Sequence, residues 1–90
     1  MTETKKQEKV LDKTKKKERH NLILWNDDVN SFDWVIKSLI EICKHEYTQA
    51  EQCALIVHNK GKAAVKSGEK EELLKLKREF DKRQISTTVE

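Results

Sequence analysis

The residues best suited to chemistry are three consecutive acceptors, Asn26, Asp27 and Asp28, and a histidine further along the chain, His58. The three acceptors follow the apolar run 22–25 and precede an amphipathic stretch, so they occupy a strand-to-helix corner. Amide and carboxylate oxygens accept hydrogen bonds, and so does one nitrogen of a neutral imidazole. Because no Lys or Arg stands beside the three acceptors in the sequence, the pattern predicts a site for a small cation. An ammonium group next to an apolar pocket fits this predicted site.

Each half of this pattern also has a plain structural explanation. Asn and Asp often follow strands simply because they form turns and cap helices. A single histidine beside core positions of a helix is by default a packed or half-exposed side chain. Neither feature alone establishes a site, and the elements that carry them must bring them together.

The acceptors are flanked by a predicted strand and a predicted helix. Residues 20–25 contain the continuous apolar run 22–25, which indicates a short buried strand, and residues 26–30 form a loop. Apolar residues then recur at steps of three and four, which predicts a helix over about 31–44. Ser31 or Asn30 can cap its free N–H groups. The residues of its apolar stripe are Phe32, Val35, Ile36, Leu39 and Cys43.

The rest of the chain predicts two further helices and two strands. Thr48 followed by Glu51 is a capping-box pattern, which places the start of a second helix there, and Gly61 is suited to end it. Its stripe consists of Ala50, Cys53, Ala54 and Val57. A short strand over 63–65, a turn at 67–68, a helix over about 69–82 and a strand over 85–89 complete the chain. The order β-α-α-β-α-β predicts an α+β fold, in which a small three-stranded antiparallel sheet packs against three helices.

Charge divides the chain into two parts. Residues 1–19 hold eight Lys or Arg and four acidic residues, a net charge of +4, and because the whole chain carries +3, residues 20–90 carry −1. With so few apolar residues, 1–19 is predicted to be a disordered basic extension, and 20–90 a single folded domain. No apolar run is long enough to span a membrane, and the two cysteines form no disulfide framework. We therefore expect a cytoplasmic protein.

Three other kinds of site are disfavoured. Four possible zinc ligands, Cys43, His45, Cys53 and His58, lack the closely paired spacing of zinc sites. The chain has no glycine-rich phosphate loop, and the remaining nucleophile candidates, Cys43–His58 and Cys53–His58, use thiols that face the core, where a thiolate is disfavoured. Nucleic acid would meet a slightly acidic domain with an anionic loop. We expect no metal, no catalysis and no nucleic-acid binding by the domain.

At the level of family, three segments resemble ClpS, the adaptor of the ATP-dependent Clp protease in the N-degron pathway. They are LILWNDD at 22–28, FDWVI at 32–36 and VHNKGKA at 57–63, with Ala50 between the last two. The resemblance runs without gaps from about 22 to 63 and resumes at 88–90. The region of the third helix is shorter than usual in the family and diverges from it.

This resemblance implies a binding adaptor, not an enzyme, that acts as a monomer without a cofactor. ClpS proteins bind substrates that begin with Leu, Phe, Tyr or Trp and deliver them to a Clp AAA+ unfoldase of the ClpA or ClpC type. The match assigns the substrate α-amino group to Asn26, Asp28 and His58, with Asp27 shaping the loop. It assigns the wall of the side-chain pocket to Leu24, Asn30, Phe32, Val35, Ala54, Val57 and Ile85.

Three positions depart from the family pattern. Ala54 stands where a bulky Met is usual, Phe32 replaces another Met, and Ser31 stands where the family commonly has Pro. One change enlarges the pocket and another adds a ring, so its volume is kept but its shape differs. The preferred first residue is therefore left open. The alternative function is a small protein- or nucleic-acid-binding domain that acts through its basic tail and shares the similar fold of the ribosomal-stalk C-terminal domain.

Overall fold

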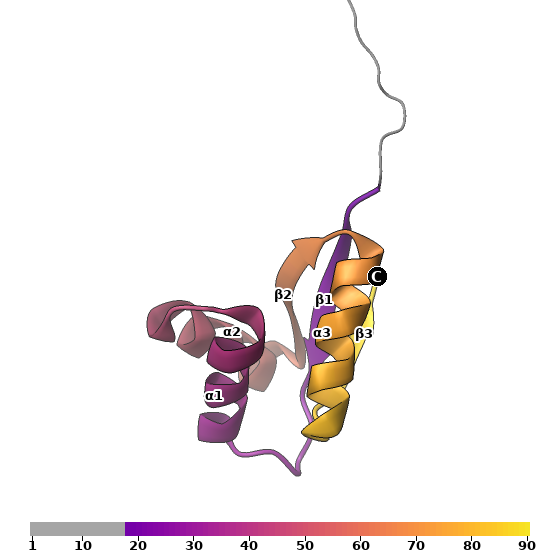
Figure 1. Cartoon of the computed structure of the whole chain (residues 1–90). Helices are drawn as coiled ribbons and strands as arrows, with labels where there is room; N and C mark the ends of the chain where they lie inside the picture. The colour runs from indigo at the N-terminus through magenta and orange to yellow at the C-terminus, as the bar shows by residue number, and fades with distance from the viewer. Residues whose placement is uncertain (1–17) are drawn as a thin grey trace, which may run out of the picture.

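The computed structural model describes residues 18–90, which form a three-stranded sheet and three helices (Figure 1). The elements are β1 (His20–Trp25), α1 (Phe32–Cys43), α2 (Tyr47–Lys60), β2 (Lys62–Gly68), α3 (Lys70–Lys82) and β3 (Thr87–Val89). This order and the antiparallel sheet confirm the predicted α+β fold. Apart from Glu18 and Arg19, the extension predicted at 1–19 lies outside the described residues.

The central strand of the sheet is β1, which pairs with β2 on one side and with β3 on the other, both antiparallel. The end of β1 that leads into the acceptor loop is held from both sides. The Trp25 N–H donates to the carbonyl of Ser86 at 3.0 Å, and the Asn26 N–H donates to the carbonyl of Gly61 at 2.8 Å. The first acceptor of the loop is thereby fixed to the C-terminal end of α2.

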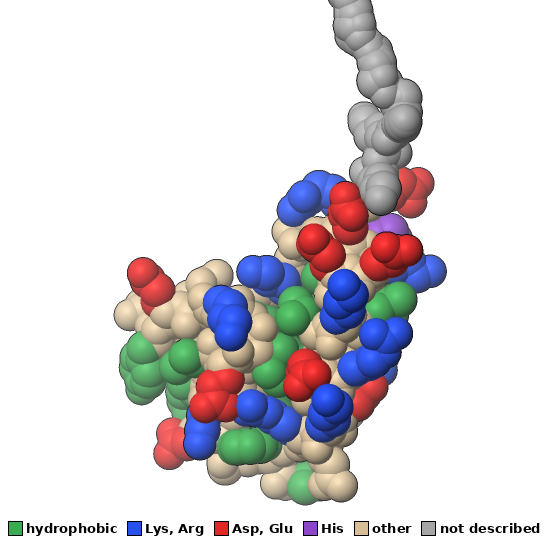
Figure 2. Space-filling model, viewed as in Figure 1, with side chains coloured by type: hydrophobic (Ala, Val, Ile, Leu, Met, Phe, Trp, Pro, Cys, Tyr) green, Lys and Arg blue, Asp and Glu red, His purple; other side chains and the backbone are tan. Residues whose placement is uncertain are grey.

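One face of the sheet carries the core. Leu22 and Leu24 of β1 are buried, whereas Asn21, which points to the opposite face, is exposed. The α1–α2 hairpin and α3 lie side by side in Figure 1, and both contact the sheet. The other buried apolar residues are Val35, Ile36, Leu39, Ile42, Cys43, Ala50, Ala54, Val57, Ala63, Val65, Leu73, Phe80 and Ile85. Figure 2 shows acidic and basic side chains intermixed over α3, the solvated side of that helix.

The predicted helix ends are confirmed at two positions and wrong at one. The Ser31 hydroxyl caps α1 by accepting from the Trp34 N–H at 3.1 Å, and Gly61 ends α2 with a φ of +93°. The capping box at Thr48 is wrong, because α2 begins at Tyr47 after Glu46 and no side chain caps it. The first helical bond, from the Ala50 N–H to the Glu46 carbonyl at 2.9 Å, already encloses Thr48 within the helix.

The predicted bounds of two strands are also corrected. The turn placed at residues 67–68 is instead the end of β2, because Ser67 and Gly68 pair with Asn21 and His20 of β1. On the other edge β3 begins at Thr87, so Ile85 precedes the strand although it is buried. In both cases the strand length is set by pairing with β1, which local sequence patterns do not describe.

A bulge in β2 explains why His45, which is a possible metal ligand by residue type, is buried. Leu22 pairs with Lys66 and Ile23 with Ala64, so Val65 is an extra residue on β2. The carbonyl of Val65 lies 2.7 Å from Nε2 of His45, which is 5% exposed and acts as the donor. His45 therefore satisfies a backbone group near the bulge.

The end of α3 is joined to α1 through one side chain. Arg83 donates to the Ser38 hydroxyl at 3.1 Å, forms a 2.7 Å ion pair with Glu41 and lies over the Trp34 ring. Ser38 is fully buried, and within residues 18–90 Arg83 is the only hydrogen-bond partner of its hydroxyl. Arg83 thus holds α1, which carries one wall of the candidate site, against α3. None of the described helices is long and apolar enough to cross a bilayer.

Candidate functional site

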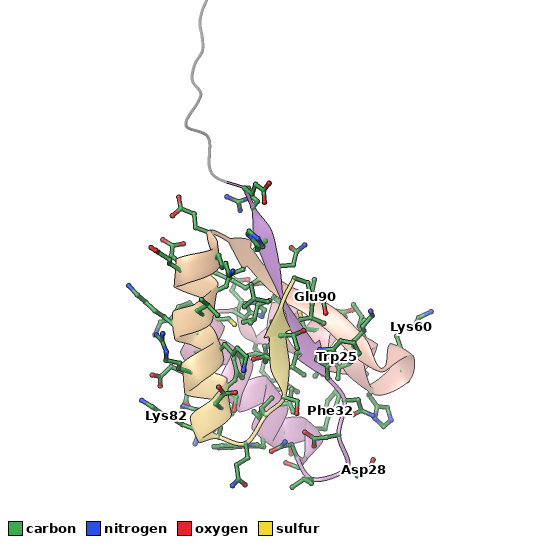
Figure 3. The ribbon with its side chains drawn as sticks, turned by 90° about the vertical axis from the view of Figure 1, so that its right-hand side faces the viewer. Trp25, Asp28, Phe32, Lys60, Lys82 and Glu90 are labelled. Carbon is green, nitrogen blue, oxygen red and sulfur yellow. The ribbon has the colours of Figure 1, made fainter. Side chains whose placement is uncertain are left out.

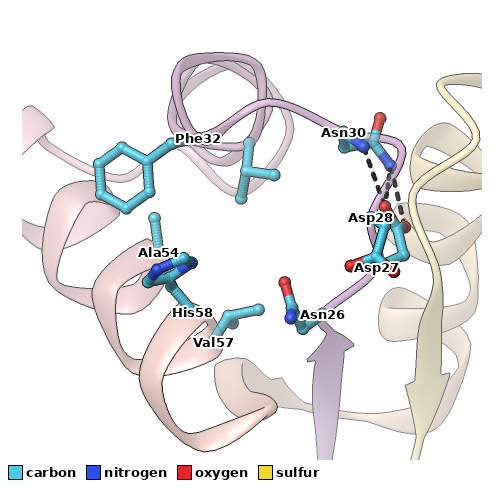
Figure 4. Close-up of a pocket in the computed structure, with 9 residues that line it drawn as sticks. Asn26, Asp27, Asp28, Asn30, Phe32, Ala54, Val57 and His58 are labelled. Atoms are coloured by element: carbon cyan, nitrogen blue, oxygen red, sulfur yellow. Dashed lines mark hydrogen bonds between the residues drawn. The ribbon is translucent and has the colours of Figure 1, made fainter.

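A cavity of about 250 Å³ opens between the β1–α1 loop and α2 (Figure 4). One side of it comes from the loop and the first turn of α1, and the other from the second half of α2. Nine residues line it: Asn26, Asp27, Asp28, Asn30, Phe32, Val35, Ala54, Val57 and His58. All nine belong to the set predicted from the sequence, and the fold brings them together although the acceptors of the loop and His58 lie about thirty positions apart.

Asp27 shapes the loop. Its Oδ1 accepts from the backbone N–H groups of Val29 and Asn30, each at 3.0 Å, and its carboxylate also accepts from the Asn30 side-chain amide at 2.9 and 3.1 Å. The same amide donates to the carbonyl of Gln84 at 2.9 Å, which ties the loop to the segment before β3. The bonds between Asp27 and Asn30 are drawn as dashed lines in Figure 4, and together with the bond from Val29 they leave little of this carboxylate for a ligand.

The hydrogen bonds to Asp27 also set its charge. Partial burial alone would raise the pKa of this carboxyl, but the bonds from Asn30 and Val29 outweigh that effect and hold the pKa below its ordinary value of 3.8. A carboxyl whose pKa is lowered by folding stabilises the folded state above its unfolded pKa. The contribution of Asp27 is therefore present above about pH 3.8 and is lost as the pH falls through the lowered value.

Three other acceptors at the cavity have no side-chain hydrogen bond within residues 18–90. The side chains of Asn26, Asp28 and His58 are exposed, and within residues 18–90 they make no side-chain hydrogen bond or ion pair. Figure 4 shows Asn26 and the loop facing His58 of α2 across the cavity. An amide oxygen, a carboxylate and an imidazole thus face one opening from different directions, and no lysine or arginine of the described chain lines it.

The apolar wall consists of Phe32 and Val35 of α1 and of Ala54 and Val57 of α2. Val35, Ala54 and Val57 are buried, whereas the Phe32 ring is 38% exposed.

Leu24 and Ile85, which were also predicted as wall residues, do not line this cavity. They line an adjoining space of about 20 Å³, which shares Asn26, Asp27, Asn30, Val35 and Val57 with the cavity. The assignment of Leu24 and Ile85 to the wall of the side-chain pocket therefore stays a prediction.

A sequence model of ATP-dependent Clp protease adaptor protein ClpS matches residues 15–87. The chain belongs to the ClpS family. The structure also matches Agrobacterium tumefaciens ClpS2 bound to L-phenylalaninamide, with a TM-score of 0.78 and 20% sequence identity, over 83% of this chain and 98% of the other. At that identity the likeness shows the ClpS fold. A comparison with curated protein sequences gave no match.

The remaining His, Cys, Asp and Glu side chains of residues 18–90 form neither a metal site nor a reactive thiol in this ClpS domain. Within residues 18–90, no three His, Cys, Asp or Glu side chains gather as metal ligands would. Burial raises the pKa of the Cys43 thiol to about 11 and also raises that of Cys53. Both are therefore protonated thiols at neutral pH, which disfavours the nucleophile pairs considered above.

Proposed function

We propose that this ClpS chain binds proteins whose first residue is large and hydrophobic (Leu, Phe, Tyr or Trp) through the free α-amino group and the first side chain. We further propose that it delivers them to a Clp AAA+ unfoldase of the ClpA or ClpC type. One observation carries the binding step: three uncommitted acceptors stand at the mouth of a cavity whose wall is apolar.

The acceptors match the chemistry of an α-ammonium group. Such a group offers three N–H donors, and Asn26, Asp28 and a neutral His58 offer three acceptors. Hydrogen bonds that involve a charged group contribute about 1.5–3 kcal/mol each. Because Asp27 is occupied by the loop, we assign the ammonium charge to Asp28.

The apolar wall accounts for the first side chain. Burying a side chain of the size of Leu or Phe contributes about 1.5–3 kcal/mol. A Lys or Arg side chain would lose the hydration of its charge in the same space, so basic first residues should be rejected. The related Agrobacterium ClpS2 supports this assignment, because L-phenylalaninamide carries a free α-amine and a benzyl group.

The binding step is tested by calorimetric titration with a Phe-initiated peptide and with its N-acetylated form. The free peptide should bind, and acetylation should lower the affinity at least 100-fold, about 2.7 kcal/mol, because it removes the charge and two donors. Equal affinities for the free and acetylated peptides would contradict an amine site.

The delivery step is assigned to residues 1–19. The described chain enters β1 at the end opposite to the acceptor loop, and a six-residue strand spans roughly 20 Å. Figure 3 shows Asp28 and Phe32 toward the acceptor-loop end of the domain, and the chain enters β1 at the other end. A partner bound by the extension therefore need not compete with a ligand bound in the cavity.

Deletion of residues 1–18 should leave peptide affinity unchanged and reduce degradation of a Phe-initiated fluorescent reporter by a Clp protease several-fold. This deletion retains Arg19, which donates to the Ser67 hydroxyl at 3.2 Å. A chain in which residues 1–18 are replaced by a Gly/Ser segment of equal length is the matched control and should behave like the deletion. Full degradation activity in either chain would refute a role of the extension in delivery.

The adaptor is proposed to be a cytoplasmic monomer without catalytic activity or cofactor, and its domain to bind neither nucleic acid nor membrane. Cys43 and Cys53 are free thiols, which suits a reducing compartment. The intermixed charges over α3 (Figure 2) and the exposed Asp28 in the loop are unfavourable for contact with phosphates.

A further inference from the structure

We propose that Phe32 makes this cavity selective for aromatic first residues over leucine. This inference rests on the proposed function and narrows its class of ligand. It concerns the order of side-chain preference, which the sequence left open.

Phe32 is the only aromatic side chain among the nine residues that line the cavity. The other apolar members, Val35, Ala54 and Val57, are aliphatic and between 2% and 8% exposed. The ring of Phe32 is 38% exposed, so it presents more of its surface to an incoming group than they do. Figure 4 shows the ring at the rim of the cavity beside Ala54.

The small side chain of Ala54 leaves room for a second ring. Ala54 is 2% exposed and lies on α2 one turn before His58, so it lines the cavity next to the proposed amine site. The cavity of about 250 Å³ exceeds the space of about 150 Å³ that holds a benzene molecule in a protein interior. A phenyl ring and the larger indole ring are therefore both candidates to enter.

Two aromatic rings attract each other beyond the area that they bury. Such pairs contribute about 0.5–1.5 kcal/mol, which corresponds to about a two- to twelvefold change in affinity. Leucine buries apolar surface in the same space but has no ring to pair with Phe32. Phe-, Tyr- and Trp-initiated peptides should therefore bind about two- to twelvefold more tightly than the matched Leu-initiated peptide.

The test measures dissociation constants for peptides that differ only in the first residue: Leu, Phe, Trp and cyclohexylalanine. The last has a ring of similar outline without aromatic electrons, so it separates shape from ring pairing. The unsubstituted chain should bind Phe more tightly than cyclohexylalanine and Leu. In Phe32→Leu the ratio of the Phe affinity to the Leu affinity should fall by about two- to twelvefold.

Leu55→Ala is the matched control. Leu55 is as exposed as Phe32, at 38%, and stands next to Ala54 in α2, but it does not line the cavity. This variant should keep the affinity ratio of the unsubstituted chain. A Phe/Leu ratio that is the same in Phe32→Leu as in the unsubstituted chain would overturn the selectivity proposal alone, because the peptides would still bind. Absence of binding by every free-amine peptide would instead overturn the proposed function.

Discussion

Replacing Asp28 by alanine should weaken the binding of a Phe-initiated peptide by about 10- to 150-fold, as measured by calorimetry. This range corresponds to the loss of one hydrogen bond to a charged partner, about 1.5–3 kcal/mol. The fold should be unaffected, because the Asp28 side chain is exposed and makes no hydrogen bond within the described chain. Its free energy of unfolding should stay within about 0.5 kcal/mol of the unsubstituted value.

Two neighbouring acids provide the controls for this result. Asp33→Ala removes an equal charge from the first turn of α1, where the side chain is exposed and does not line the cavity, and it should keep the peptide affinity. Asp27→Ala should lower both affinity and stability, because four hydrogen bonds of the loop end on this carboxylate. If Asp33→Ala and Asp28→Ala weaken binding equally, the effect is general electrostatics and Asp28 is not the ammonium partner.

Replacing Phe80 by alanine should lower the free energy of unfolding by about 3–5 kcal/mol. Phe80 is fully buried near the end of α3, and its carbonyl accepts from the N–H groups of Arg83 and Ile85, each at 3.0 Å. A domain of this size has about 4–10 kcal/mol of stability in total. The variant should therefore be close to unfolding at moderate temperature, as urea denaturation monitored by circular dichroism would show.

The same chemical change at Phe32 separates stability from binding. Because Phe32 is partly exposed at the cavity rim, Phe32→Ala should lower stability by less than about 1 kcal/mol and still weaken the binding of a Phe-initiated peptide. Phe80→Leu, which keeps most of the buried volume, should retain a measurable folded state. A small loss of stability in Phe80→Ala would show that this residue does not anchor α3.

What the sequence predicted well was set by local chemistry. Ser31 caps α1 and Gly61 ends α2, since a hydroxyl acceptor and a residue with positive φ act within one helical turn. The loop acceptors and His58 were placed in one site by family resemblance. Spacing alone does not reveal that β1 and α2 meet through the bond between Asn26 and Gly61.

The predictions that failed depended on distant partners. The length of β2 follows from pairing with the whole of β1, and its bulge at Val65 is accompanied by a buried partner, His45, twenty residues away. The capping box at Thr48 failed because α2 begins two residues earlier than it predicts, with Glu46 at the N-cap position and Tyr47 as the first helical residue.

The 2.8 Å bond between the Asn26 N–H and the Gly61 carbonyl has a thermodynamic consequence. This main-chain bond holds the acceptor loop against α2. It joins Asn26 itself to Gly61, which lies three residues after His58, so the two sides of the proposed amine site are fixed relative to each other. When a ligand binds to a site that is already ordered, less of the binding free energy is spent on ordering the protein. In the proposed function, such preorganisation lets a few contacts suffice to bind the ligand.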